Sequence, residues 1–389
     1  MDGRLLPSET APPGGPVLVI GAGLVGLSCA WLLTRRGHRV LLVDAGPATR
    51  DPPRPEDPPE RGSEAALGVL MGRVFHRSSG RGWRLRQRSL DLWQAWRAEL
   101  AERGRPVPWR PGLLLLAADA EEMQRHRVLL EDPERLAAGL QRWDPQRLQA
   151  LAPPVPAAAV AGLYSPQDGQ VDPLAVMEAL ESDALSAGMV RCRSRVEVLE
   201  RHGEQWQVRL CSGERWRAPW LVLAAGLGSP SLLAGAAWPS PVPLEPVLGQ
   251  ALELELDPAD RPESAGWPGA VVWRGINLIL RPPLVGEEAD GPWRVWMGAT
   301  LEPGRQADSE ALEALRGLAG EAPPWLLRAR IRRRWQGLRA RPAGEAAPLL
   351  RELAPGLLLA AGHYRNGVLL APVSAEWVVS RIEGCSGPA

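Results

Sequence analysis

The feature that most constrains the fold is a glycine-rich stretch near the start of the chain, residues 17–26 (Val-Leu-Val-Ile-Gly-Ala-Gly-Leu-Val-Gly). Four apolar residues precede glycines at G-x-G-x-x-G spacing, and an apolar helical pattern follows at residues 27–33, which predicts a strand, a tight turn and a helix. The three glycines allow the turn, the approach of a pyrophosphate and close helix packing, in that order. A helix N-terminus favours the anion. The expected pyrophosphate site is Gly21, Ala22, Gly23, Leu24, Val25 and Gly26.

The residues that follow complete a strand–helix–strand unit. Gly37 predicts the end of the helix, and residues 40–43 (Val-Leu-Leu-Val) predict a second strand that ends in Asp44. This acid lies 18 residues past Gly26, close to the ~20 expected of a carboxylate that accepts from a ribose hydroxyl. We therefore expect Asp44 and its neighbour Ala45 at the ribose end of a dinucleotide site. The alternative is a glycine-rich turn in another kind of strand–helix–strand unit.

The composition narrows the classes of function. A chain of 389 residues can form about two or three domains, and 45% hydrophobic with 23% charged residues is typical of a soluble globular protein. Lys plus Arg and Asp plus Glu are equal at 45 each, so no overall charge attracts nucleic acid or membrane. All the basic residues of that count are arginines, which excludes a Schiff-base lysine, a phosphate-binding P-loop lysine and a lysine that activates oxygen.

The cysteines and histidines give no metal pattern. Cys29, Cys192, Cys211 and Cys385 are far apart and form no C-x-x-C, which is typical of a reducing compartment. No other histidine stands at metal-ligand spacing from His363, so we expect no metal and a supporting role for this side chain. No window approaches the ~18 apolar residues of a membrane span. A soluble cytoplasmic protein is the expectation.

Two segments are expected to lie outside the packed core. Residues 1–13 carry prolines and acids without an apolar stretch, so we expect a disordered tail and not a signal peptide. Residues 46–62 are dense in proline and charge, which predicts an exposed loop. Residues 63–74 are small and apolar and include Gly68, which predicts either backbone close to a ligand or a buried helix.

The remaining pattern predicts an ordered series of elements. Asp172 and Pro173 are typical of a helix N-cap and first turn. Pro111, Pro133 and Pro145 are expected to interrupt the region 106–156. Helices are expected at 89–102, 174–187, 309–318 and 372–382, and strands at 195–200, 205–210, 220–225, 251–256, 271–280, 293–299, 325–336 and 356–361. The strand-rich region 241–338 indicates a second domain inserted between dinucleotide-type segments.

Five motifs in order carry a family resemblance: the glycine motif with its acid, residues 63–70 with 89–93 (Ser-Leu-Asp-Leu-Trp), residues 168–173 (Asp-Gly-Gln-Val-Asp-Pro), the strand ending at 224–226 (Ala-Ala-Gly), and 335–339 (Trp-Gln-Gly-Leu-Arg) with 362–372 (Gly-His-Tyr-Arg-Asn-Gly-Val-Leu-Leu-Ala-Pro). The chain resembles the FAD-dependent amine-oxidising enzymes that include D-amino-acid oxidase, sarcosine oxidase and, closest, glycine oxidase of thiamine biosynthesis. The resemblance implies an α/β (α+β overall) fold, with a Rossmann-type FAD-binding domain at 14–85, 157–240 and 336–389. An antiparallel-sheet substrate-binding domain at 86–156 and 241–335 completes it.

The same resemblance implies the cofactor, the reaction and the site. FAD would take a hydride from the Cα of a small amino acid or amine, and water would hydrolyse the imine to a keto acid and ammonia. Arg339 would bind the substrate carboxylate as a bidentate guanidinium, and Arg365 would lie near flavin and substrate. The N–H groups of residues 366–370 and the positive end of a helix at Pro372 would face the flavin pyrimidine. Further expected cofactor contacts are Ala66, Gly68, Val196, Ala225, Gly226, Gly362, Arg365, Asn366, Gly367, Val368 and Leu369.

The chain also departs from the family, and alternatives stay open. Glycine oxidases carry a substrate tyrosine on a strand ending Y-x-x-P-R, and we align Leu278 with it. The electron acceptor is either oxygen, with release of peroxide, or another carrier. A tRNA-modifying flavoprotein is a further possibility, suggested by the basic run at 328–334, and a flavin-binding protein without catalysis is another. The resemblance implies no nucleic-acid or membrane partner, and it leaves open a homo-oligomer and a covalent or non-covalent flavin.

Overall fold

The dinucleotide-type segments meet in one sheet. The computed structural model describes residues 4–5, 16–46, 62–236, 238–262, 266–283 and 291–384. Within these residues the sheet has the order β19 (Leu349–Ala354), β20 (Leu357–Ala361), β12 (Trp220–Leu223), β2 (Val17–Ile20), β3 (Val40–Val43) and β8 (Val190–Cys192). Its neighbouring strands are parallel except for β19, which runs antiparallel to β20. The strands β2 and β3 confirm the expected strands at 17–20 and 40–43.

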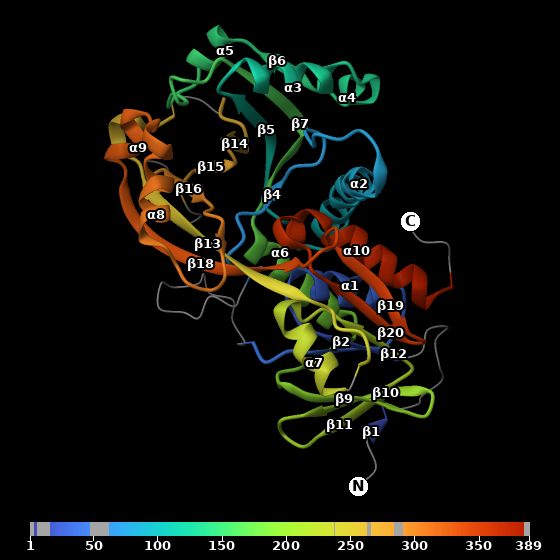
Figure 1. The fold of residues 1–389 in the computed structure, drawn as a ribbon. Coiled ribbons are helices and arrows are strands. Elements are labelled where there is room, and N and C mark those ends of the chain that lie inside the picture. The colour runs from blue at the N-terminus through green and yellow to red at the C-terminus, as the bar shows by residue number, and fades with distance from the viewer. Residues whose placement is uncertain are drawn as a thin grey trace.

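Helices cover one face of this sheet. The helix α1 (Leu24–Arg35) packs against α10 (Gly367–Ile382) and α6 (Pro173–Ser186), and α2 (Gly80–Glu102) packs against α10 (Figure 1). Trp31 meets Trp96 edge to face at 4.6 Å between ring centroids, and the buried Trp93 meets the same ring. The Trp31 indole donates to Asp183 of α6 at 2.8 Å, which fixes α1 against α6.

The last helix begins five residues earlier than the expected start at Pro372, because its first turns are supported from outside. Pro372 lies inside α10 and has no N–H to give to the carbonyl of Val368. The Trp93 indole donates to the carbonyls of Val368 and Leu369 at 3.2 and 3.1 Å instead. The Ser89 hydroxyl also donates to Leu369 O, at 2.5 Å. The helix therefore tolerates its internal proline because α2 satisfies the freed carbonyls.

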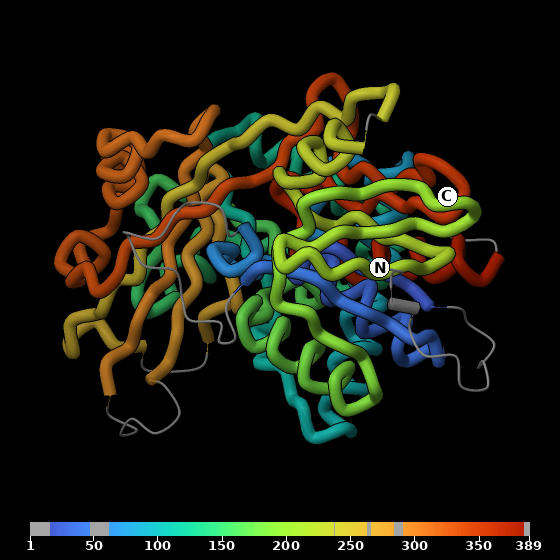
Figure 2. Tube along the Cα trace, turned by 90° about the horizontal axis from the view of Figure 1, so that it is seen from below, coloured from blue at the N-terminus to red at the C-terminus, as the bar shows by residue number. Residues whose placement is uncertain are grey.

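The inserted part is a large mixed sheet. Its order is β17 (Glu302–Pro303), β13 (Leu244–Glu255), β16 (Arg294–Gly298), β15 (Ile276–Arg281), β14 (Ala270–Trp273), β5 (Trp109–Ala117), β7 (Ala161–Val171) and β4 (Val69–Leu70). The strand β18 (Arg330–Pro342) pairs with β13, and β6 (Gln141–Trp143) pairs with β7. These pairs are antiparallel except β14 with β5, so the expected antiparallel sheet is confirmed. Figure 2 shows β13 (yellow) and β18 (orange-red) crossing from this part toward the parallel sheet.

Short helices lie around the large sheet, and two of them begin at prolines that were expected to interrupt the region. They are α3 (Ala120–Leu130), α4 (Pro133–Ala137), α5 (Pro145–Gln149), α8 (Ser309–Arg316) and α9 (Pro324–Arg328), with 3-10 turns at Pro258–Asp260 and Leu318–Gly320. Pro133 and Pro145 start helices, because Asp132 and Asp144 cap them. The expected strand at 325–336 begins only at Arg330, since Trp325 is helical and donates to Pro154 O at 2.7 Å.

A small sheet lies on the other face of the parallel sheet. It has the order β1 (Arg4–Leu5), β11 (Arg215–Ala218), β10 (Gln205–Leu210) and β9 (Val196–His202), next to α7 (Ser229–Gly235) and a 3-10 turn at Gly226–Gly228. Residues 4 and 5 pair with β11, so these two residues of the expected disordered tail are ordered. The rest of the tail and residues 47–61 of the expected loop lie outside the described residues.

Two elements cross the expected domain boundaries. The helix α2 starts in residues assigned to the FAD-binding part and continues past residue 86, yet its buried side chains share the core of α1 and α10. The strand β7 lies in residues assigned to the FAD-binding part but pairs with β5 in the large sheet. Asp172 caps α6, as the sequence predicts, by accepting from the backbone of Leu174 and Ala175.

Candidate functional site

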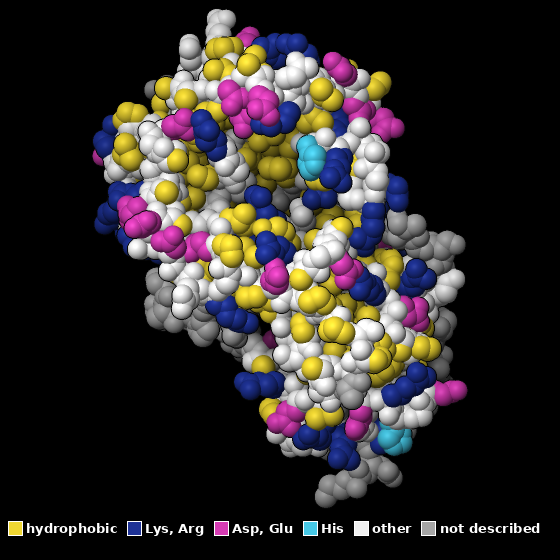
Figure 3. Space-filling model, in the orientation of Figure 1, with side chains coloured by type: hydrophobic (Ala, Val, Ile, Leu, Met, Phe, Trp, Pro, Cys, Tyr) yellow, Lys and Arg dark blue, Asp and Glu magenta, His cyan; other side chains and the backbone are white. Residues whose placement is uncertain are grey.

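One cavity of about 810 Å³ runs along the ends of the parallel strands and on to the large sheet. Its wall includes the glycine turn after β2, Asp44 after β3, residues 224–227 after β12 and residues 360–369 at the end of β20 and beyond it. It is also lined by residues 274–277, in the β14–β15 turn and the start of β15, and by Arg339 of β18. Figure 3 shows a hollow beside α2 and the large sheet, with hydrophobic side chains inside it and basic side chains at its edge.

The glycine turn leaves no room for side chains. Gly21 has φ +101°, and a Cβ there would lie 2.5 Å from the carbonyl oxygen of Ala224. A Cβ on Gly26 would lie 1.8 Å from the carbonyl oxygen of Gly21, so the close contact between α1 and the turn requires glycine. Gly23 is the N-cap of α1 and lines the cavity. The glycines of the turn therefore place no side chain of their own between the N-terminus of α1 and the cavity.

Asp44 ties the ends of two strands together beside this turn. Its carboxylate accepts from the backbone N–H of Ala22 at 2.8 Å and of Gly46 at 2.6 Å. Arg191 of the neighbouring β8 approaches it at 3.6 Å. Ser63 stands opposite, where its hydroxyl accepts from the N–H of Leu24 at 3.0 Å. Asp44 lines the cavity.

The C-terminal loop closes the cavity with a helix N-terminus. Gly362 follows β20 with φ +66°, Tyr364–Asn366 forms a 3-10 turn, and α10 begins at Gly367. The first N–H groups of a helix have no partner within it, and those of α10 lie where residues 366–369 line the cavity. This position differs from the expected helix start at Pro372 and brings the positive end of the helix dipole to the loop itself.

His363 holds that loop to its helix. Its Nε2 lies 2.8 Å from the Ser374 hydroxyl, and this hydroxyl donates to the carbonyl of Leu370 at 2.7 Å. Because the serine proton is used, Nε2 must carry the proton and donate. Burial, and then the nearby Arg81 cation, lower the pKa of His363 to about 3. The imidazole is therefore neutral at ordinary pH and supports the loop, as the sequence led us to expect.

Arg339 reaches the cavity from β18. Its Nη1 donates to the carbonyls of Leu248 and Thr300, both at 3.1 Å. The guanidinium lies over Gly249, where a Cβ would come within 2.2 Å of Nη2. Burial, and then the neighbouring Arg365 cation, lower the pKa of Arg339 from its ordinary value. Arg365 is exposed and lines the same cavity, so the structure brings the two expected arginines together.

A buried polar network fixes one of the carbonyls that hold Arg339. The Thr300 hydroxyl accepts from the N–H of Gln250 at 2.7 Å and donates to the carboxylate of Glu302. Glu302 also accepts from the Gln250 amide at 3.0 Å and from the N–H of Asp308 at 2.6 Å. Thr300 and Glu302 are both buried. The network fixes Thr300, and Thr300 in turn positions the guanidinium of Arg339.

Comparison with known proteins identifies the family. The model of the family described as "DAO: FAD dependent oxidoreductase" matches residues 16–381. The chain belongs to this family. It is therefore a flavin-dependent oxidoreductase that uses FAD, and its fold is confirmed by the similar solved structures. Glycine oxidase from Geobacillus kaustophilus has a TM-score of 0.79 at 24% identity, over 96% of this chain and 95% of that one.

The similar proteins differ in their named activities. The tRNA 5-methylaminomethyl-2-thiouridine biosynthesis bifunctional protein MnmC of Cupriavidus necator is 30% identical over 94% of this chain and 57% of its own length. Its Marinobacter nauticus counterpart is 27% identical over the whole of this chain and 59% of its own length. The chain thus spans less than two thirds of these relatives. Glycine oxidase from Geobacillus kaustophilus is 27% identical over 94% of this chain and 92% of its own length.

The cavity of this DAO family member has the features that FAD needs. A Cβ-free turn at a helix N-terminus suits the pyrophosphate, and a second helix N-terminus at α10 suits the polar edge of the ring. Of the expected cofactor contacts, most line the cavity: Gly21, Ala22, Gly23, Val25, Asp44, Ala66, Gly68, Ala225, Gly226, Gly362, Arg365, Asn366, Gly367, Val368 and Leu369. The residues therefore fit an extended dinucleotide that reaches from β2 to α10.

Four expected contacts do not line the cavity. Leu24 points its buried side chain into the helical core, and Gly26 lies against Gly21. Ala45 is exposed, and Val196 packs into the core under the parallel sheet. Several wall residues were missed: Ser63, Met71, Phe75, His76, Arg86, Arg274, Asn277, Leu301 and Tyr364.

The structure places Asn277, and not the expected Leu278, in the cavity wall. Leu278 is fully buried in the core on the other face of the sheet, whereas Asn277 lines the cavity. Strand side chains alternate between faces, so a shift of one residue exchanges core for cavity. If Arg281 is the arginine of Y-x-x-P-R, the tyrosine position is 277. The Asn277 amide donates to Gly298 O at 3.0 Å, so a polar side chain occupies this position.

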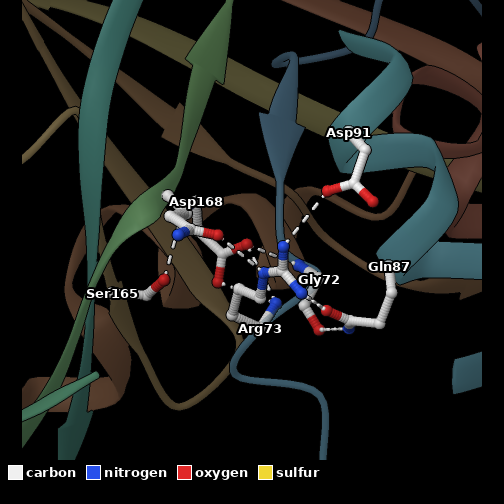
Figure 4. Close-up of polar contacts among 7 residues, drawn as sticks. Gly72, Arg73, Gln87, Asp91, Ser165 and Asp168 are labelled. Atoms are coloured by element: carbon white, nitrogen blue, oxygen red, sulfur yellow. Dashed lines mark hydrogen bonds and ion pairs between the residues drawn. The ribbon is translucent and has the colours of Figure 1, made fainter. Parts of the chain in front are cut away.

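The loop of residues 72–77 forms the wall next to α2 and is held by two buried charges. Asp168 accepts from the backbone N–H groups of Gly72, Arg73 and Val74 at 2.8 to 3.1 Å (Figure 4). Arg135 donates to the carbonyls of residues 73, 75 and 77 at 2.7 to 3.1 Å. Burial raises the pKa of Asp168, and the three N–H groups act in the opposite direction.

The basic run at 328–334 is largely neutralised within the fold. Arg328 pairs with Asp260 at 2.6 Å. Arg330 and Arg332 both pair with Glu255, at 2.8 and 3.3 Å. These acids lie on or just after β13, the strand that pairs with β18. Acids on β13 and in the turn after it therefore pair with three arginines of the run that suggested a tRNA surface.

Within the described ranges, two further properties can be stated. No helix there is long and apolar enough to cross a bilayer. No three His, Cys, Asp or Glu side chains of these residues gather in a way that could hold a metal ion.

Proposed function

We propose that the protein oxidises the C–N bond of a small amino acid or amine, in the manner of a glycine oxidase, within thiamine biosynthesis in the cytoplasm. The observation that carries this proposal is Arg339, a largely desolvated guanidinium held by two carbonyls at the end of a cavity that fits FAD. Such a cation binds a carboxylate through two parallel hydrogen bonds. When bound, FAD supplies the ring that accepts the hydride.

The residues of this chain would act mainly by positioning. Arg339 binds the substrate carboxylate and so orients Cα toward the ring. Asn277 offers a further polar side chain in the cavity wall, and the N-terminus of α10 favours negative charge where the ring accepts electrons. Because the chain has no lysine, no lysine side chain takes the proton of the substrate amine.

The absorption spectrum of the purified protein tests the cofactor, and anaerobic addition of glycine, sarcosine or a D-amino acid tests the reaction. We expect bleaching of the flavin band, then its return with peroxide when air is admitted. Bleaching without reoxidation by air would show that the protein is not an oxidase and would indicate a dehydrogenase that uses another electron acceptor. No bleaching by amines of this class would contradict the proposal.

The matched variants are Arg339→Ala and Arg341→Ala. Both arginines lie on β18, but Arg341 is exposed and pairs with Glu245 outside the cavity. We expect Arg339→Ala to lower kcat/KM by roughly 10²-fold or more, since a charged hydrogen-bond pair is lost from a desolvated site. The Arg341→Ala variant should retain most of the wild-type value.

A second candidate is oxidation of a modified tRNA base, favoured by the two bifunctional MnmC relatives. The pairing of Arg328, Arg330 and Arg332 with acids lowers the net positive charge that this run offers to RNA. Direct binding of tRNA at two salt concentrations separates the candidates. A steep loss of affinity with salt would favour this second function, whereas no binding at low salt would exclude it.

A further inference from the structure

Arg86 is a desolvated cation in the cavity wall that no carboxylate of the described residues neutralises. It projects from α2, lies 3.8 Å above the centroid of the Phe75 ring and donates from Nη1 to the carbonyl of Gly82 at 3.0 Å. No ion pair involves its guanidinium among the described residues. Burial lowers the pKa of Arg86 from its ordinary value. A partly buried cation without a counter-charge is costly unless a ligand supplies the charge.

The surroundings of Arg86 are basic. Burial, and then the cations of Arg77, Arg86 and Arg135, lower the pKa of His76, a further wall residue. Among the described residues, the acids that line the cavity are Asp44 and Glu64. Asp44 lies beside the glycine turn, where it accepts from the N–H of Ala22. No described carboxylate forms an ion pair with Arg86.

The other cations that line the cavity differ from Arg86 in their partners or their exposure. Arg274 already pairs with Glu321, at 2.8 Å. Arg339 is assigned to the α-carboxylate of the substrate. Arg365 is exposed, whereas the Arg86 guanidinium is partly buried and stacks on Phe75. Arg86 is thus a desolvated cation in addition to the one that a single carboxylate needs.

The position of the Arg86 guanidinium is fixed by the contacts of its neighbours. The ring on which it stacks belongs to the loop of residues 72–77. Asp168 binds three N–H groups of this loop, and Arg135 binds three of its carbonyls. The stem of Arg86 stands on α2, which packs against α10. Both sides of the cation are therefore fixed, which favours specific recognition of a ligand group.

We propose that Arg86 binds a second carboxylate of the substrate, so that the preferred substrates are amino acids whose amine carries a carboxyalkyl group. Arg339 holds the carboxylate next to the reacting Cα, and Arg86 with Phe75 holds the far one. This inference rests on the proposed function for its reaction. It goes beyond that function by naming the substrate class.

Iminodiacetate and sarcosine form the matched test, because they differ only by the second carboxylate. The wild-type enzyme should oxidise iminodiacetate with the higher kcat/KM. Arg86→Met should lower the ratio of the two kcat/KM values by roughly 10- to 100-fold, as expected for loss of a charge-assisted hydrogen bond. Arg88→Met is the control, since Arg88 lies on the same helix and pairs with Glu376 outside the cavity; its ratio should equal that of the wild type.

A binding measurement separates this inference from the proposed function. Glutarate and butyrate also differ by one carboxylate and cannot be oxidised as amines, and their binding is read from the absorption spectrum of the bound FAD. Tighter binding of glutarate that is lost in Arg86→Met and partly kept in Arg86→Lys supports the subsite even without turnover. If wild-type protein binds both acids equally, or if Arg86→Met keeps the preference, the inference is overturned. Bound FAD in each variant confirms that it folds.

Discussion

Acidification should destabilise the protein through His363, and the size of the effect follows from its burial. The pKa of His363 in the fold is about 3, against about 6.5 in an unfolded chain. The unfolded chain therefore binds a proton between these values while the folded protein does not. Stability from this group is complete above pH 6.5 and is lost progressively as the pH falls toward 3. At pH 5 the loss is about 2 kcal/mol, from 1.5 pH intervals at about 1.36 kcal/mol each.

Urea unfolding at pH 7.5 and pH 5, with excess FAD throughout, measures this loss for wild type and for His363→Gln. Glutamine does not titrate, and its amide can still donate to Ser374. Other titrating groups contribute to both proteins and cancel in the difference. We expect wild type to lose about 2 kcal/mol more than the variant between the two pH values.

The control is His202→Gln, at an exposed position on β9. It should show the same pH dependence as the wild type. An equal loss of stability in wild type and His363→Gln would refute the assignment of a neutral buried imidazole at this position.

Three other substitutions test the packing and polar contacts of the site. Gly26→Ala places a methyl group 1.8 Å from the carbonyl oxygen of Gly21 and should abolish tight FAD binding, measured by flavin fluorescence; undiminished affinity would contradict the packing. Glu302→Gln should raise KM several-fold with a smaller change in kcat, because it loosens Arg339 indirectly; an unchanged KM would exclude that role. Asp168→Asn should lower the free energy of unfolding, measured by urea denaturation, by about 2–4 kcal/mol. A clearly smaller decrease would contradict the role of Asp168 in holding the loop.

Local sequence patterns predicted the elements whose causes are local. The strands β2 and β3 are continuous apolar runs bounded by glycine or acid, and their limits agree with the sequence. The glycine turn could also be predicted from the sequence, because its tight contacts involve residues a few positions apart or the strand end at Ala224. The start of α10 could not be predicted from the local sequence. Pro372 signals a helix start in isolation, and contacts from Ser89 and Trp93, far away in the chain, permit an earlier one.

The same distinction explains the candidate site. The loop of residues 362–369 carries a contiguous motif, so it was recognised together with Arg339. Arg86 was missed, because its place in the wall depends on the loop of residues 72–77, which Asp168 and Arg135 hold from distant positions. The choice of Leu278 over Asn277 failed for a geometric reason. A strand exposes alternate residues, and its neighbours β14 and β16 decide which set faces the cavity.

The helix α2 joins the two ends of the site. Toward the substrate end it presents Arg86, and toward the cofactor end Ser89 and Trp93 satisfy the first carbonyls of α10. These residues lie within two turns of one helix, and a packed helix moves as a rigid unit more readily than it bends. Any displacement of α2 would therefore change the proposed carboxylate subsite and the helix N-terminus beside the flavin together. The internal proline of α10 makes this dependence obligatory, because Pro372 offers no N–H to the carbonyl of Val368 and the Trp93 indole of α2 donates to it instead.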